Sequence, residues 1–175
     1  MSRLQWIFSG ILLVAFMAAE AVLDDETQKT IDGICRQTKD YRFCEGIFVE
    51  NLKTSSPSIK DLVNVTVGRS EMFSANTIFF ISQLLRNVGS ERDGLQMCAD
   101  AYAKVNIAFS LAVSWIRQGQ YSEVLELEES VSKDVEICKT DYDVPSYDVN
   151  PMIERNGKMT ILMTMVRIVC HMLDL

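Results

Sequence analysis

The sequence lacks most of the groups from which enzymes build active sites. It contains one histidine, His171, and no glycine-rich loop of the kind that cradles phosphates. No two cysteines have the CxxC spacing of a metal site. Cys170 precedes His171, but neighbours on a helix point about 100° apart, so the two are poorly placed to act as nucleophile and base. The sequence therefore predicts a protein with no catalytic activity, metal or cofactor.

Clustered positive charge is also missing. The 175-residue chain has a formal net charge of -7, whereas phosphate binding needs grouped lysines and arginines, so nucleic acid is excluded as a partner. Four carboxylates gather in one segment and could imitate a catalytic pair: Glu123, Glu126, Glu128 and Glu129. At the start of a helix such a cluster is stabilised by the helix dipole, and we interpret it as a solvated acidic face.

An apolar leader opens the chain. Arg3 and the α-amino group supply positive charge, residues 6–19 are almost entirely apolar, and Ala19-Glu20-Ala21 resembles a cleavage site. The apolar run is shorter than the roughly 20 residues that span a bilayer. We expect a signal peptide at residues 1–21 and a secreted domain at residues 22–175, in a compartment where disulfides persist. A membrane anchor is the alternative.

The C-terminal segment from Met159 to Leu175 is apolar and rich in methionine, as a membrane-active helix could be. It is too short to span a bilayer, and Arg167 and His171 interrupt it. We therefore interpret its methionines as core residues and predict no stable membrane insertion.

The mature region has a helical pattern throughout. Apolar residues three and four positions apart gather on one helical face. Three segments have such stripes: Leu95, Cys98, Tyr102, Val105, Phe109, Ala112 and Ile116; then Val124, Leu127, Val131, Val135 and Cys138; then Met159, Leu162, Val166, Val169 and Leu173. A fourth stripe is less regular and uses Leu62, Val65, Phe73, Phe80 and Leu84.

Helix boundaries follow from local signals. Ser58 with Asp61, and Ser90 with Asp93, have the spacing of helix caps, and Asn150-Pro151 can cap and open a helix. Gly119 separates two helical segments. Short connections favour antiparallel neighbours, so we predict an all-α, up-and-down four-helix bundle with helices at about 59–88, 91–118, 121–140 and 151–173. Residues 25–54 lie outside the bundle and suit an N-terminal helical hairpin.

Four of the five cysteines fall into two pairs. Cys35 and Cys44 enclose eight residues, and Cys98 and Cys138 enclose thirty-nine. The layout suits one local link and one long-range link that would hold two bundle helices in register. Unpaired buried cysteines are the alternative.

Four short motifs follow one another in a fixed order along the chain. Residues 35–44 (CRQTKDYRFC) have Thr three positions after the first cysteine and an aromatic residue before the second. Residues 95–102 read L-x-x-C-x-x-x-Y. Residues 119–121 read G-x-Y before the fourth cysteine, and residues 151–156 read P-M-I-E-R-N. In this order and spacing the motifs resemble those of the plant invertase and pectin methylesterase inhibitors, over nearly all of the mature chain.

The resemblance implies a helical bundle with an N-terminal hairpin, stapled by disulfides Cys35–Cys44 and Cys98–Cys138, with no catalysis of its own. Members bind a carbohydrate-active enzyme one to one and cover its active site. Some relatives carry a fifth cysteine near the position of Met163, whereas this chain has Cys170. We expect Cys170 to be an unpaired, partly buried thiol, with intermolecular pairing as the alternative.

The target is either pectin methylesterase or invertase. Invertase inhibitors often carry Pro-Lys-Phe where this chain has Tyr121 and its two successors, but the Lys39-to-Tyr41 spacing is closer to the invertase branch. We favour pectin methylesterase, with target contacts from Gln120, Tyr121, Ser122 and Glu123. An invertase inhibitor and a non-inhibitory secreted helical module are the alternatives. The expected location is the apoplast or cell wall, with the vacuole as the alternative.

One modification signal is present. Asn64-Val65-Thr66 is an N-glycosylation sequon, although it falls inside a predicted helix.

Overall fold

The computed structural model describes residues 23–86, 92–140 and 150–173, and the predicted leader at residues 1–21 lies outside them. Within this part of the chain the secondary structure is six helices and no strand. They are α1 (Asp25–Cys35), α2 (Tyr41–Asn51), α3 (Ile59–Leu85), α4 (Arg92–Arg117), α5 (Tyr121–Thr140) and α6 (Ile153–His171).

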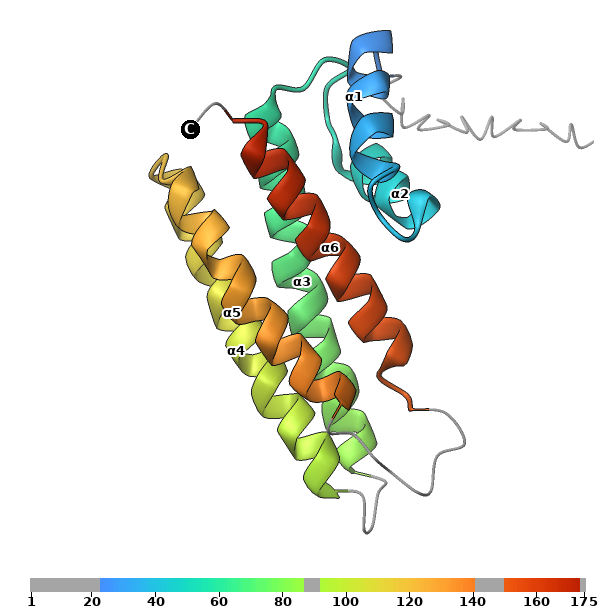
Figure 1. Ribbon diagram of the computed structural model, residues 1–175, viewed down its shortest axis with the longest axis vertical. Helices are drawn as coiled ribbons and strands as arrows, with labels where there is room; N and C mark the ends of the chain where they lie inside the picture. Colours follow the sequence, from blue (N-terminus) through green and yellow to red (C-terminus); the bar gives the residue numbers. More distant parts are fainter. Residues whose placement is uncertain (1–22, 87–91, 141–149, 174–175) are drawn as a thin grey trace, which may run out of the picture.

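Helices α3 to α6 form an up-and-down four-helix bundle (Figure 1). α3 packs on α4 and α6, and α5 packs on the same two helices, so each helix contacts two neighbours around the core. The short helices α1 and α2 form a hairpin against α3 and α6, at the end of the bundle where α3 begins and α6 ends (Figure 1). The predicted fold class is confirmed.

Side-chain caps begin α1, α2 and α3, where Asp24, Asp40 and Ser58 accept from backbone N–H groups. Ser58 and Asp61 form a capping box at α3, in which the Ser58 hydroxyl accepts from the Asp61 N–H and the Asp61 carboxylate accepts from the Ser58 N–H. Asn150 Oδ1 accepts from the Met152 N–H at 2.7 Å, and α6 begins at Ile153 rather than at Pro151. The other expected cap residue, Ser90, lies outside the described residues.

The core forms where three of the four predicted stripes place it. Every residue of the α4 stripe is buried. The α5 and α6 stripes are buried except at Leu127 and Leu173, which are half-buried and pack on the core. The sequence pattern therefore orients these three helices correctly.

The predicted stripe of α3 marks the edge of the core and not its centre. Of its members only Leu62 is buried, while Val65, Phe73, Phe80 and Leu84 lie at the edge of the core. The face of α3 that enters the core carries apolar and hydroxyl residues together: Leu62, Val63, Thr66, Val67, Ser70, Ser74, Thr77 and Ile81. Each of its four hydroxyls donates to a carbonyl three or four residues earlier, so none is left unsatisfied by burial.

Two disulfides hold the elements together. Cys35–Cys44 joins α1 to α2 within the hairpin, and Cys98–Cys138 joins the beginning of α4 to the end of α5. By loop-closure entropy the longer link is worth about 4 kcal/mol and the shorter about 2.5 kcal/mol. These are the pairs that the resemblance implied.

Candidate target-binding surface

The turn between α4 and α5 is fixed by its backbone. Gly119 has φ of 76°, the left-handed conformation that favours glycine, and only Gln118 separates it from the end of α4 at Arg117. The Gln120 N–H donates to the Trp115 carbonyl at 2.9 Å, and the Gly119 N–H donates to the Ile116 carbonyl at 3.0 Å. This pair of bonds is a Schellman motif. The turn closes one end of the α4–α5 pair and Cys98–Cys138 closes the other, so both helices are held at both ends.

The Tyr121 side chain is more constrained than a fully exposed side chain would be. Its ring is half-buried and packs against the edge of the core, and the Lys60 ammonium lies 5.6 Å from the ring centroid. Lys60 belongs to the first turn of α3, so the contact links the turn to a neighbouring helix. A cation over an aromatic face is attracted to the ring by roughly 0.5–1 kcal/mol at an exposed site. The sequence had no signal for this contact because the partner is about 60 residues away.

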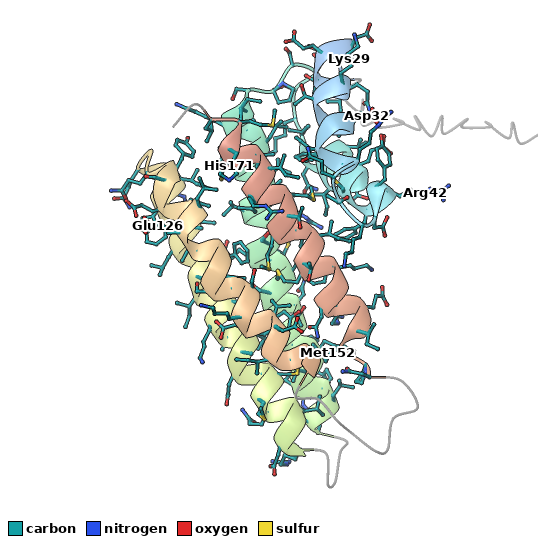
Figure 2. The ribbon with its side chains drawn as sticks, in the orientation of Figure 1. Lys29, Asp32, Arg42, Glu126, Met152 and His171 are labelled. Atoms are coloured by element: carbon teal, nitrogen blue, oxygen red, sulfur yellow. A yellow bond between two sulfur atoms is a disulfide. The ribbon has the colours of Figure 1, made fainter. Side chains whose placement is uncertain are left out.

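The remaining predicted contact residues flank Tyr121. Gln120 and Ser122 are exposed, and Glu123 is half-buried. Glu126 is exposed and lies on the outer side of α5 (Figure 2). The side chains of Glu128 and Glu129 lie outside the described part of the structure. The turn therefore presents one half-buried aromatic ring beside polar side chains and carboxylates.

Residues of two recognised motifs meet in the core. Tyr102 ends the motif at residues 95–102, and its hydroxyl donates to Asn156 Oδ1 at 2.8 Å; Asn156 ends the motif at residues 151–156. Burial raises the pKa of Tyr102, and the nearby Arg155 opposes that shift in part. The Arg155 guanidinium stacks 4.1 Å from the Phe80 ring centroid. These motif residues join α4 and α3 to α6, so they serve the fold and not the surface.

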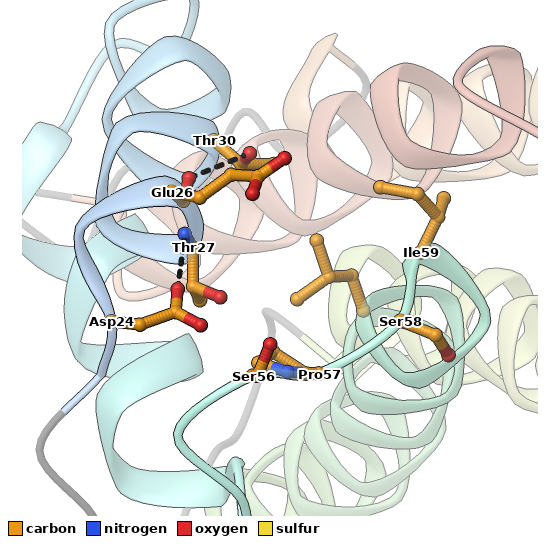
Figure 3. Close-up of a pocket in the computed structure, with 9 residues that line it drawn as sticks. Asp24, Glu26, Thr27, Thr30, Ser56, Pro57, Ser58 and Ile59 are labelled. Carbon is orange, nitrogen blue, oxygen red and sulfur yellow. Dashed lines mark hydrogen bonds between the residues drawn. The ribbon is translucent and has the colours of Figure 1, made fainter.

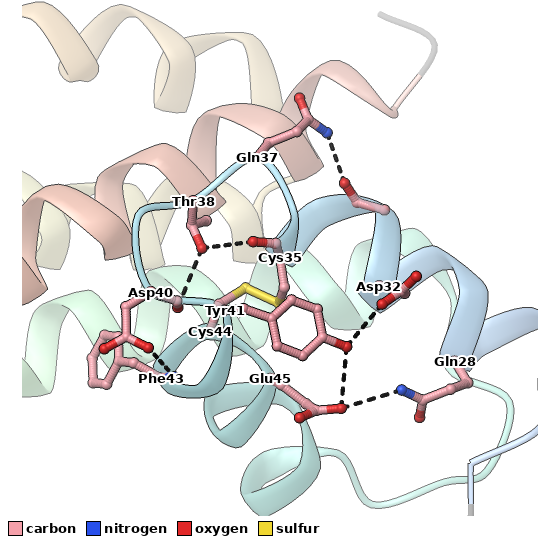
Figure 4. Close-up of a disulfide and its surroundings, with 11 residues drawn as sticks. Gln28, Asp32, Cys35, Gln37, Thr38, Asp40, Tyr41, Phe43, Cys44 and Glu45 are labelled. Carbon is pink, nitrogen blue, oxygen red and sulfur yellow. Dashed lines mark hydrogen bonds between the residues drawn. A yellow bond between two sulfur atoms is a disulfide. The ribbon is translucent and has the colours of Figure 1, made fainter.

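A network of hydrogen bonds lies beside the hairpin disulfide (Figure 4). The Tyr41 hydroxyl donates to Asp32 at 2.8 Å and lies 3.3 Å from Glu45, which also accepts from Gln28. The hydrogen bond to Asp32, aided by partial desolvation, raises the pKa of Tyr41 to about 12. Tyr41 thereby ties α2 to α1 beside the Cys35–Cys44 bond. The motif around this disulfide also specifies structure.

A cavity of about 270 Å³ lies between the hairpin and the start of α3 (Figure 3). Its walls are mostly short polar and acidic side chains: Asp24, Glu26, Thr27, Thr30, Ser56, Pro57, Ser58, Ile59 and Leu62. The Thr27 N–H donates to Asp24 at 2.7 Å, and hydrogen bonds from Thr27 and Ser56 lower the pKa of Asp24. The polar groups at both helix starts are therefore already used as caps, which leaves the cavity few donors for a ligand.

Cys170 and His171 are the side chains that could most readily be proposed as a nucleophile and a base. Cys170 is poorly suited to the role. Cys170 is buried, and burial raises the pKa of its thiol to about 12, far from the range in which a thiolate forms. His171 is exposed at the end of α6 (Figure 2). In the part of the chain that the structure describes, no three His, Cys, Asp or Glu side chains converge as metal ligands would. None of the helices in these ranges combines the length and hydropathy that a bilayer-spanning segment needs.

Comparisons with known proteins show likeness at the level of solved structures. No protein-family model matches the chain, and no curated protein matches it. The crystal structure of a pectin methylesterase inhibitor from Arabidopsis thaliana is similar, with a TM-score of 0.63 and 14% sequence identity, over 87% of this chain and 99% of that chain. The likeness thus extends well beyond a single pair of helices. At this identity it shows a shared fold.

Proposed function

We propose that the protein is an inhibitor-like binding protein that covers the active site of a carbohydrate-active enzyme in a one-to-one complex, with pectin methylesterase as the favoured target. The observation that carries the proposal is the fold shared with a pectin methylesterase inhibitor along most of both chains. The sequence motifs support it, and the burial and raised pKa of the Cys170 thiol favour binding over catalysis.

Secretion is part of the proposal. Residues 1–21 have the charge and apolar pattern of a signal peptide, and the two disulfides suit an oxidising compartment such as the apoplast. Cleavage would leave residues 22–175 as the inhibitor domain. Within a cell wall this domain would meet enzymes that act on pectin and sucrose.

The proposed contact surface is the α4–α5 turn, with Gln120, Tyr121, Ser122 and Glu123 as contact residues. The Schellman motif fixes the backbone of this turn, so binding would order few backbone groups. Tyr121 is half-buried, and displacement of Lys60 would present more of its ring. Since this turn lacks the Pro-Lys-Phe of many invertase inhibitors, we favour pectin methylesterase over invertase.

Parallel inhibition assays test the target and the surface together. The oxidised mature protein is titrated against a purified pectin methylesterase and a purified invertase, as wild type and as Tyr121→Ala. We expect inhibition of pectin methylesterase, weakened roughly thirtyfold by the substitution, because truncation of a buried aromatic anchor often costs 2 kcal/mol or more. Circular dichroism verifies that the variant is folded.

Phe79→Ala is the matched control. Phe79 is the most exposed large apolar residue of the described chain, at 64%, and it lies in the second half of α3, far along the helix from Lys60 and Tyr121. Loss of inhibition in Phe79→Ala but not in Tyr121→Ala would move the contact surface to α3. Inhibition of invertase alone would reverse the target, and inhibition of neither enzyme would favour a non-inhibitory binding module.

A further inference from the structure

The sequon Asn64-Val65-Thr66 lies in the second turn of α3. The helix exposes one of its two essential residues and buries the other. Asn64 is exposed, whereas Thr66 is fully buried and its hydroxyl donates to the Val63 carbonyl at 3.1 Å. Residues two positions apart on a helix point about 200° apart. An enzyme that must engage both the Asn64 amide and the Thr66 hydroxyl therefore cannot reach both once α3 has formed.

A hollow lies beside Asn64, between α3 and the end of α2. Its volume is about 270 Å³, and it is lined by Asn51, Asn64, Val65, Gly68, Arg69 and Met72. Gly68 contributes no side chain, and a Cβ at this position would meet no heavy atom within 4 Å. Met72 is 45% exposed, so part of its apolar side chain faces solvent. The surface next to the acceptor is thus open, partly apolar and large enough for a sugar ring.

From this geometry we propose that Asn64 carries an N-linked glycan, attached before α3 folds, whose first sugar residues cover the hollow beside Gly68 and Met72. In the transfer, the Asn64 side-chain nitrogen forms a bond to the anomeric carbon of a lipid-diphosphate-linked oligosaccharide. The anomeric bond to the diphosphate breaks, the diphosphate leaves with the lipid, and the nitrogen loses one proton. The apolar face of the first sugar then replaces water over Met72. This proposal rests on the secretion proposed above and is independent of any inhibitory activity.

Expression with the native leader in a eukaryotic secretory cell tests the modification. We expect the secreted protein to lose mass on digestion with peptide N-glycosidase F. Asn64→Gln and Thr66→Val are expected to abolish that shift, and Thr66→Ser to retain it. Asn64 is exposed and Val matches the shape of Thr, so both variants are expected to fold, which circular dichroism verifies. Secreted protein that is insensitive to the glycosidase, or a failure of the chain to enter the medium, overturns the proposal.

The order of events has a separate test. Unglycosylated, oxidised protein that retains Asn64 is incubated with solubilised oligosaccharyltransferase and lipid-linked oligosaccharide, either folded or after reduction and unfolding. We expect transfer to the unfolded chain alone. Equal transfer to the folded protein would overturn the conclusion that burial of Thr66 blocks the reaction.

Methionine oxidation reports where the glycan lies. Met97 on α4 is 42% exposed, close to the value for Met72, and so serves as an internal control. Under mild peroxide we expect Met72 to oxidise more slowly than Met97 in the glycosylated protein, and the two rates to become similar in Asn64→Gln. A Met72 rate unchanged by the glycan would overturn its placement over the hollow. The inhibition assays test the proposed function separately from the glycan experiments. A negative result for one proposal therefore leaves the other standing.

Discussion

Burial decides the chemistry of Cys170, the one cysteine outside the two disulfides. The thiolate is the reactive form of cysteine, and the raised pKa of about 12 keeps this thiol protonated at ordinary pH. Its fully buried position among the core residues of α6 also denies access to reagents. The same burial argues against an intermolecular disulfide through this residue.

We expect native protein to resist alkylation by iodoacetamide at pH 8 and to take up one label per chain after unfolding without reductant. Mass spectrometry of the intact protein measures both states. Rapid labelling of the native protein, or a dimer that reductant separates, would show that Cys170 is accessible and would contradict the packing described for α6.

Because of Tyr41, the stability of the hairpin is expected to fall at alkaline pH. Its hydrogen bond to Asp32 needs the protonated phenol, and the pKa rises from 10.0 to about 12 in the folded state. A group whose folded pKa is raised contributes stability that is fully present below its unfolded pKa and is lost as pH rises through the folded value. The contribution of Tyr41 is therefore complete below pH 10 and lost between pH 10 and about 12.

We expect wild type to lose stability relative to Tyr41→Phe as pH rises across this window, because the variant has no phenol to ionise. Urea denaturation of both proteins at several pH values measures the difference, and lysine titration cancels because both carry the same lysines. A constant difference between the two proteins from pH 9 to about 12 would mean that the phenol is not held by Asp32.

Among the structural elements, the α4–α5 turn depends on one backbone conformation. Gly119 adopts a positive φ that costs other L-residues about 1–2 kcal/mol. Gly157, within α6, has ordinary helical geometry, and a Cβ added there would meet no heavy atom within 4 Å, so only its flexibility distinguishes it from alanine. Substitution by alanine is therefore expected to change the stability of the protein in opposite directions at the two glycines.

We expect Gly119→Ala to destabilise the protein by about 1–2 kcal/mol and Gly157→Ala to stabilise it by roughly 0.5–1 kcal/mol. Chemical denaturation gives both values. Because the proposed contact surface is this turn, Gly119→Ala is also expected to weaken inhibition, whereas Gly157→Ala is not. A neutral Gly119→Ala would show that the turn tolerates another conformation.

Helix α3 shows what a hydrophobicity pattern misses. Its buried hydroxyls read as polar in the sequence, but each donates to a carbonyl of its own helix, so their burial leaves no donor unsatisfied. Meanwhile Phe79 is exposed and Phe80 lies at the core edge, where Arg155 stacks on it. The orientation of α3 follows from the shapes of its neighbours and from local hydrogen bonds, which periodicity does not record.

At the scale of the whole molecule, two disulfides reinforce the four-helix bundle and its hairpin. We propose that this scaffold binds a target enzyme. We expect the mature protein to form a one-to-one complex with pectin methylesterase and to turn over neither pectin nor sucrose by itself. Light scattering coupled to gel filtration gives the stoichiometry, and product assays give turnover. Turnover that Glu126→Gln abolished would show that the acidic face of α5 is catalytic and would remove the case for an inhibitor.

Spacing along single helices was enough to predict the all-α class, the cysteine pairs suited to disulfides and the buried faces of α4, α5 and α6. Packing between helices settled which side of α3 enters the core, that Asn156 accepts from Tyr102, and that Lys60 covers Tyr121. Those contacts join residues more than 50 positions apart or depend on the shapes of neighbouring helices. Local patterns carry no record of such distances, which is why the half-buried position of Tyr121 could not be predicted from the sequence.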